Sequence, residues 1–88
     1  MVVPIDFRWN AWNVEHATRH GCSIDEIETV VRNAGPAFPR RLEADKWFVE
    51  GRGTGDRLIR VIYLLSPNPT AYVIHAMPLT TRRGRKGR

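Results

Sequence analysis

Arginine, tyrosine and histidine side chains recur in the second half of the sequence, around segments that alternate apolar and polar residues. They are Arg52, Arg57, Arg60, Tyr63 and His75. These residue types suit cleavage of RNA without a metal. A base must take the proton of the ribose 2′-hydroxyl, an acid must protonate the leaving oxygen, and a cation must hold the charged phosphorane. Alternation predicts Arg57 and Tyr63 on one strand face and Arg60 on the other. An equally weighted interpretation makes Arg57 a hairpin residue paired with Asp56 or Glu50.

A second group lies on a predicted helix over residues 11–20. At about 100° per residue, Trp12, His16 and Arg19 fall on one side, with His20 at the edge. The opposite side carries the predicted core contacts Ala11, Val14 and Ala17. In one interpretation Trp12 packs under the edge of a sheet and the histidines satisfy nearby backbone groups. In the other, the stripe binds an anionic ligand, with a titratable imidazole beside a guanidinium.

Other site chemistries have little support. His16 and His20 have the i, i+4 spacing of zinc ligands on a helix, but no carboxylate stands between them and no second Cys/His cluster exists. The glycine-rich segment 51–55 joins strand to strand, so it lacks the helix terminus that binds phosphate. Cys22 is the only cysteine and cannot form an internal disulfide. The sequence therefore predicts neither a metal nor a cofactor.

Charge is distributed unevenly along the 88 residues. The last seven residues contain Arg82, Arg83, Arg85, Lys86 and Arg88 and no acid, and without these five cations the formal charge of +5 becomes zero. We therefore expect one domain over residues 1–81 and a basic, disordered tail over residues 82–88. The tail is either a solvated end or an arm that follows phosphates with a salt-sensitive attraction.

No leader-like or membrane-spanning pattern is present. The start has no basic segment followed by an apolar stretch, and the longest apolar run, residues 61–65, is far below the roughly 20 residues of a membrane span. The single cysteine agrees with a reducing compartment. We expect a cytoplasmic protein without a membrane partner.

Residue periodicity predicts the elements that position these side chains. Residues 5–9 alternate as a short strand, Asn10 caps the first helix and Gly21 ends it. Ser23-Ile24-Asp25-Glu26 is a capping box, and the helix that follows has an apolar face ended by Gly35-Pro36. Strands are predicted over residues 46–52, 58–65 and 70–77, with a further, weak one around 38–42. The expected fold is α+β, with the first strand and two helices packed on a three- to four-stranded antiparallel sheet. The other sheet face would stay open to a ligand or partner.

Two motifs resemble the opening of BrnT-like toxins and their uncharacterised bacterial relatives. The first is Phe7-x-Trp9-Asn10, and the second is His16-x-x-Arg19-His20-Gly21-Cys22-Ser23. The similarity continues through Glu50-Gly51-Arg52 and the strand 57–63, and it ends near residues 74–80. It covers most of the chain, from Phe7 to Thr80. The Arg-His-Gly step is its most specific part.

The resemblance implies a RelE-like fold, metal-independent endoribonuclease activity and a cognate antitoxin of the ribbon-helix-helix type. It makes Arg19, His20, Arg57 and Tyr63 the leading catalytic positions, with His20 as acid or base and the two arginines on phosphate. The expected RNA-binding residues are His16, Arg52, Arg60, His75, Arg82, Arg83 and Arg85.

The sequence departs from the family pattern at two places. Met77 stands where the family usually has an arginine, and residues 82–88 replace a charged helix with a glycine-rich segment. Loss of an arginine that would bind phosphate supports an alternative function. In that alternative the chain is a non-catalytic, toxin-like module that binds a partner protein or nucleic acid on its open sheet face.

Overall fold

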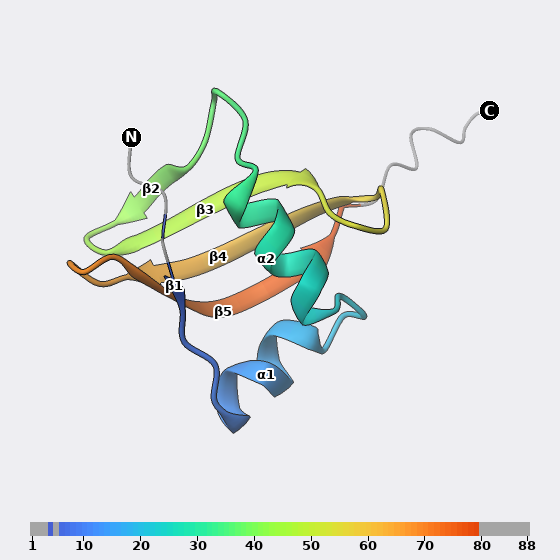
Figure 1. Cartoon of the computed structure of the whole chain (residues 1–88), viewed down its shortest axis with the longest axis horizontal. Coiled ribbons are helices and arrows are strands. Elements are labelled where there is room, and N and C mark those ends of the chain that lie inside the picture. Colours follow the sequence, from blue (N-terminus) through green and yellow to red (C-terminus); the bar gives the residue numbers. More distant parts are fainter. Residues whose placement is uncertain (1–3, 5, 80–88) are drawn as a thin grey trace.

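The computed structural model describes residue 4 and residues 6–79. Among these residues, two helices pack on one five-stranded sheet (Figure 1). The elements are β1 (Asp6–Phe7), α1 (Ala11–Thr18), α2 (Ile24–Arg32), β2 (Arg40–Glu43), β3 (Lys46–Arg52), β4 (Leu58–Leu65) and β5 (Thr70–Pro78). The α+β class predicted from the sequence is confirmed. No helix in the described residues is long and apolar enough to cross a membrane.

The sheet is larger than predicted and is mixed. Its strand order is β1-β5-β4-β3-β2, and β2 to β5 form the expected antiparallel meander. The first strand is not a separate element, because β1 pairs in parallel with β5 through Asp6 with Thr70 and Phe7 with Ala71. The Arg8 amide extends this pairing by donating to the Ala71 carbonyl at 2.9 Å. Local periodicity cannot reveal such a pairing, since it joins segments more than sixty residues apart.

Both helices begin at capping boxes. The Asn10 side chain accepts from the Asn13 backbone amide at 3.0 Å, and the Asn13 side chain accepts in return from the Asn10 amide at 2.7 Å. Ser23 and Glu26 form the predicted box at the start of α2. Helix α1 ends at Thr18 rather than at His20, and Gly21 follows with a φ of 91°, which favours glycine. Arg19 and His20 therefore lie in the turn between the helices.

The core lies between the helices and one face of the sheet. Its buried side chains on the sheet are Val49, Ile59, Val61, Tyr63, Ala71, Val73 and Ala76. Ala17, Cys22, Ile27, Val30 and Val31 cover them from the helices and the turn between them. Of the three α1 residues predicted to face the core, only Ala17 is fully buried, while Ala11 is exposed. Asn13, which the sequence analysis did not place inside, is 0% exposed.

We call the opposite side of the sheet the outer face, and no helix of residues 6–79 covers it. Strand alternation places Phe48, Arg60, Ile62 and Met77 on it, in rows set by the strand register. A register shift between Ile62 and Tyr63 leaves Ile74 as an extra residue of β5. Helix α1 packs along β5 at the edge that β1 leaves unpaired (Figure 1). Side chains of α1 therefore reach residues that β5 directs to the outer face.

Candidate active site

Two histidines from distant segments meet at the edge of the outer face. His20, in the turn after α1, and His75, on β5, have ring centroids 5.5 Å apart with their planes at 66°. His75 pairs with Ile62 of β4 next to the register shift, so β5 directs its ring to the outer face. The sequence analysis selected both residues but assigned His20 to catalysis and His75 only to RNA binding. The structure places them in edge contact.

The surroundings of His75 favour its neutral form. Burial lowers the pKa of His75 below its ordinary value of 6.5, and the positive charges of His20 and Arg60 lower it further. An imidazole held neutral at pH 7 can accept a proton. Arg60 lies two residue pairs along the sheet from His75, on the same face, and its guanidinium donates to the Glu50 carboxylate at 2.6 and 2.8 Å. The histidine pair thus lies beside a fixed cation.

Arg19 supplies a second cation close to His20 in the chain. Its side chain is exposed, and no salt bridge of the described residues includes it. An exposed guanidinium can contact a phosphate without first breaking an ion pair. The role of Arg19 stays a prediction.

Arg57 has structural partners within the protein. Its Nε and Nη2 donate to the Glu26 carboxylate at 3.1 and 3.0 Å, and Nη2 also donates to the Gly21 carbonyl at 2.7 Å. The Arg57 hydrogen bond is the main cause that lowers the pKa of Glu26, so the carboxylate stays ionised at neutral pH. Neither Asp56 nor Glu50, the two partners considered from the sequence, is its partner. Since Gly21 follows His20, Arg57 fixes the turn that carries the candidate acid.

The glycines of the β3–β4 turn make this contact possible. A Cβ at Gly53 would lie 3.0 Å from the backbone oxygen of Glu26, and a Cβ at Gly55 would lie 2.7 Å from its carboxylate. The turn therefore packs directly on the first turn of α2. Segment 51–55, which the sequence analysis did not support as a phosphate-binding loop, instead packs the β3–β4 hairpin against helix α2.

Tyr63 is not near the histidines. It lies in the core with 1% of its surface exposed, and burial raises its pKa to about 12. A phenol on the inner face cannot reach a substrate on the outer face, so we leave Tyr63 out of the candidate site. The register explains the placement, because Tyr63 pairs with inward Val73 while neighbouring Ile62 pairs with His75.

A stack of side chains continues from the histidine pair along α1. We call Arg8, Tyr72, Trp12 and His16 the ring stack. Trp12 and His16 have centroids 3.8 Å apart at 17°, Trp12 and Tyr72 have centroids 6.4 Å apart at 15°, and the Arg8 guanidinium lies 4.6 Å from the Tyr72 centroid. Trp12 is 50% exposed and therefore does not pack under the sheet edge. The other half of that interpretation is confirmed for His16, whose Nδ1 bonds the backbone oxygen of Trp12 at 2.7 Å.

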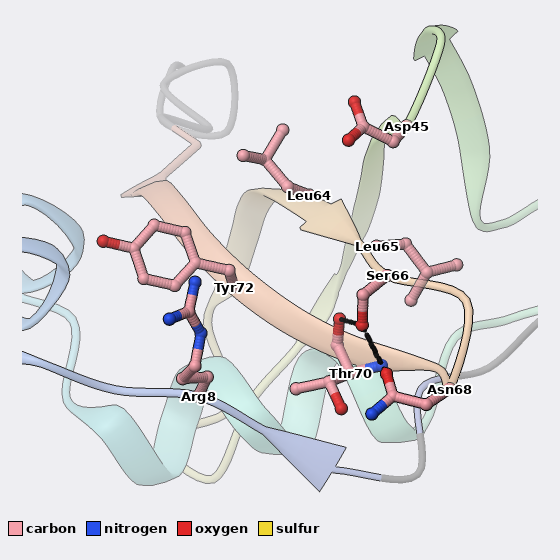
Figure 2. Close-up of a pocket in the computed structure, with 8 residues that line it drawn as sticks. All are labelled: Arg8, Asp45, Leu64, Leu65, Ser66, Asn68, Thr70 and Tyr72. Atoms are coloured by element: carbon pink, nitrogen blue, oxygen red, sulfur yellow. Dashed lines mark hydrogen bonds between the residues drawn. The ribbon is translucent and has the colours of Figure 1, made fainter.

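A hollow of about 380 Å³ opens beside Tyr72, and we call it the Tyr72 pocket. Figure 2 shows Tyr72 and Arg8 on one side of it, Asn68 and Thr70 on the other, and Asp45 near Leu64. Sequence reasoning missed Arg8 and Tyr72. Their signal was alternation in β1 and β5, which directs both to the same face once these strands are known to pair.

The remaining predicted residues are separate from the histidine pair. Arg52 is exposed and donates to the backbone oxygen of Asp56 in its own hairpin at 2.9 Å. Arg82, Arg83 and Arg85 lie outside the described residues. Among residues that the structure describes, no group of three or more His, Cys, Asp or Glu side chains could hold a metal ion.

Comparisons of the chain with protein-family models, with curated proteins and with solved structures gave no match. The resemblance to BrnT-like toxins therefore stands on the motifs in the first helix and in the strands. The chemistry proposed below stands on the histidine pair and its neighbouring cations.

Proposed function

We propose that the protein is a metal-independent endoribonuclease, the RelE-like toxin of a toxin–antitoxin pair. The observation that carries this proposal is the contact between His20 and His75 at 5.5 Å, with Arg19 next to one and Arg60 next to the other in the fold. A general base and a general acid must both reach one phosphodiester, and a cation must stabilise the charge that develops on it. The two histidines would supply the base and the acid, and Arg60 in the fold and Arg19 in the chain are the neighbouring cations.

In the proposed reaction, neutral His75 takes the proton of the ribose 2′-hydroxyl. The 2′-oxygen attacks the phosphorus, and the bond from phosphorus to the 5′-oxygen breaks. Protonated His20 gives its proton to that oxygen, which leaves as a 5′-hydroxyl. Arg19 balances the charge of the phosphorane. The products are a 2′,3′-cyclic phosphate and a 5′-hydroxyl end.

The test uses the purified protein and single-stranded RNA in EDTA. We expect cleavage with the stated ends, and we expect His20→Ala and His75→Ala each to lower the rate at least a hundredfold, as for loss of general acid–base catalysis. Glu15→Gln, an exposed change on α1, is the control. RNA that stays intact at high protein concentration would refute the proposal, and so would full activity in both histidine variants.

The pH dependence tests the assigned roles. His75 must be neutral to act as base, so the rate should fall in acid as His75 becomes protonated. Because its pKa is lowered, this acid limb should lie below pH 6.5. In His75→Ala the residual rate should lose that limb. A wild-type profile whose acid limb lies above pH 6.5 would contradict the assignment of His75 as base.

The toxin role is tested in cells. Expression without a partner should stop growth, and co-expression of the product of an adjacent gene should restore it. We expect that gene to encode a ribbon-helix-helix protein. A chain whose expression leaves growth unchanged would refute the toxin role without bearing on cleavage in vitro.

A second candidate is a non-catalytic module that binds a partner protein or nucleic acid on the outer face. A hollow of about 180 Å³ on this face, lined by Leu42, Phe48, Arg60 and Ile62, favours it. Met77, paired with Arg60 in the sheet register, places an apolar side chain where the family has a cation. Under this alternative, His20→Ala and His75→Ala would leave partner binding intact, and no RNA would be cleaved.

A further inference from the structure

The ring stack places three aromatic rings and a cation against one another at the surface. Trp12 keeps half of its surface in water although its apolar area would favour burial. His16 holds the indole from one side, since its Nδ1 bonds the Trp12 carbonyl at 2.7 Å and its ring stacks at 3.8 Å. Tyr72 is fixed at its hydroxyl, 3.3 Å from Oδ1 of Asn10. Ordered aromatic rings beside an arginine are the means by which proteins bind unpaired bases.

The Tyr72 pocket adjoins this stack and shares Arg8 and Tyr72 with it. Asp45 is one of its lining residues, and a carboxylate accepts hydrogen bonds but donates none when ionised. Guanine presents two adjacent donors on its Watson–Crick edge, N1–H and the 2-amino group, whereas adenine presents one donor and one acceptor there. A pocket with a carboxylate at its rim therefore matches guanine better than adenine.

The stack and the histidine pair lie along the same strand. Tyr72 and His75 are three residues apart on β5, which is about 10 Å at 3.3 Å per residue. Helix α1 follows that strand, with Asn10 at the Tyr72 end and His20 at the His75 end. A nucleotide held at Tyr72 would thus lie beside the proposed site of cleavage.

We propose that the Tyr72 pocket binds a guanine base of single-stranded RNA, while the ring stack holds the base next to it. This inference rests on the proposed ribonuclease function and gives it a substrate preference. Bases in a duplex are stacked and paired, so neither the stack nor the pocket can engage them without unpairing. The protein should therefore select unpaired RNA with guanine close to the cleaved bond.

The experiment measures binding separately from cleavage. A fluorescein-labelled 2′-deoxy oligonucleotide of one guanine flanked by uracils lacks the attacking hydroxyl, and its affinity is read by anisotropy. We expect Trp12→Leu and Tyr72→Leu to weaken binding roughly 5- to 150-fold, the range for loss of one base stack. Trp12→Phe and Tyr72→Phe keep a ring and should stay within about threefold of the wild type. Thermal melts of all four variants establish that the fold is retained.

Base identity is tested with the same probe. Adenine in place of guanine should weaken binding about tenfold, as for one lost base-edge contact. Asp45→Asn should remove most of that difference. Annealing the probe to its complement should abolish binding. Equal affinity for the guanine and adenine probes would overturn the assignment of guanine.

The two proposals fail in different ways. Asn33→Ala, an exposed change at the end of α2 outside both sites, should bind the deoxy probe like the wild type. If no RNA is cleaved but the aromatic variants still lose affinity, the ribonuclease proposal fails and the base site stands. If RNA is cleaved while Trp12→Leu and Tyr72→Leu bind normally, the base site is refuted alone. Free guanosine monophosphate that binds as tightly as the oligonucleotide would also overturn the inference, since the pocket would then serve a free nucleotide.

Discussion

Replacing Asn13 with alanine should destabilise the protein more than any exposed change on α1. The Asn13 side chain is fully buried, donates from Nδ2 to the Arg8 carbonyl at 2.9 Å and accepts from the Asn10 amide at 2.7 Å. Alanine would leave both backbone groups without these partners. An unsatisfied buried group costs about 1–3 kcal/mol. Arg8 and Asn10 are exposed residues whose backbone groups water can partly reach, so we expect a total loss of roughly 1–3 kcal/mol. This is a large part of the 5–15 kcal/mol by which domains are typically stable.

The assay is a thermal melt followed by circular dichroism. For a domain of this size, 1 kcal/mol corresponds to about 4–8 °C, so Asn13→Ala should lower Tm by roughly 4–24 °C. The control is Asn33→Ala, an exposed asparagine at the end of α2, which should change stability by less than about 0.5 kcal/mol. Equal Tm values for the two variants would refute the reasoning from buried hydrogen bonds.

Asn13→Asp separates the two hydrogen bonds. A carboxylate can still accept from the Asn10 amide, but its second oxygen would face the Arg8 carbonyl, which is also an acceptor. Burial and this repulsion should raise the pKa of the new carboxyl in the folded state. A raised pKa means that the folded state holds its proton at higher pH, so stability is lost as pH rises. The variant should therefore come closer to the wild type as pH falls from 7 towards 4. A difference in Tm that stays constant over this range would contradict the expectation.

Three further predictions concern other parts of the chain. Glu26→Gln should lower Tm at pH 7, because it removes the ion pair with Arg57. The pKa of Glu26 is lowered from 4.5, so this ion pair stabilises the fold above pH 4.5 and is lost in acid. The difference in Tm between the variant and the wild type should therefore shrink below pH 4. Tyr63→Phe should leave the rate of RNA cleavage unchanged and Tm nearly unchanged, because no hydrogen bond of the described residues involves its buried hydroxyl. A large loss of cleavage rate would show that Tyr63 belongs to the active site. Deletion of residues 82–88 should leave Tm unchanged and weaken RNA binding. The slope of the logarithm of the RNA-binding constant against the logarithm of the salt concentration should fall by up to about 3.5, which is about 0.7 for each of the five cations removed. Unfolding on deletion would show that the segment is structural.

Local signals in the sequence predicted the elements well. The Ser23 capping box marked the start of α2, and the strands predicted over residues 46–52 and 58–65 have the bounds of β3 and β4. Each of these elements is encoded by adjacent residues, through capping, periodicity or turn chemistry. The weak strand around residues 38–42 also exists, as β2 over Arg40–Glu43, two residues later than predicted.

Features that depend on contacts between residues far apart in the chain could not be predicted from local sequence patterns. The place of β1 beside β5 decides which way Arg8 points and brings it to Tyr72. The helical positions predicted as core contacts were the apolar residues Ala11, Val14 and Ala17, and Asn13 was not among them. Polarity alone does not show which backbone groups a buried amide can satisfy. The sequence analysis considered only acidic residues close to Arg57 in the chain as its partners. Its partner in the structure is Glu26, thirty-one residues earlier.

The parallel pairing of β1 with β5 also sets the order in which the protein can be completed during synthesis. The first strand of the described chain has no partner until residues 70 and 71 have left the ribosome. The two histidines of the proposed catalytic pair are fifty-five residues apart in the chain. His20 can therefore contact His75 only after residue 75 has been translated. A nascent chain that still lacks β5 has the helices but not the site. If the proposed function holds, a ribonuclease built this way would stay inactive towards the message from which it is being translated until β5 has been synthesised.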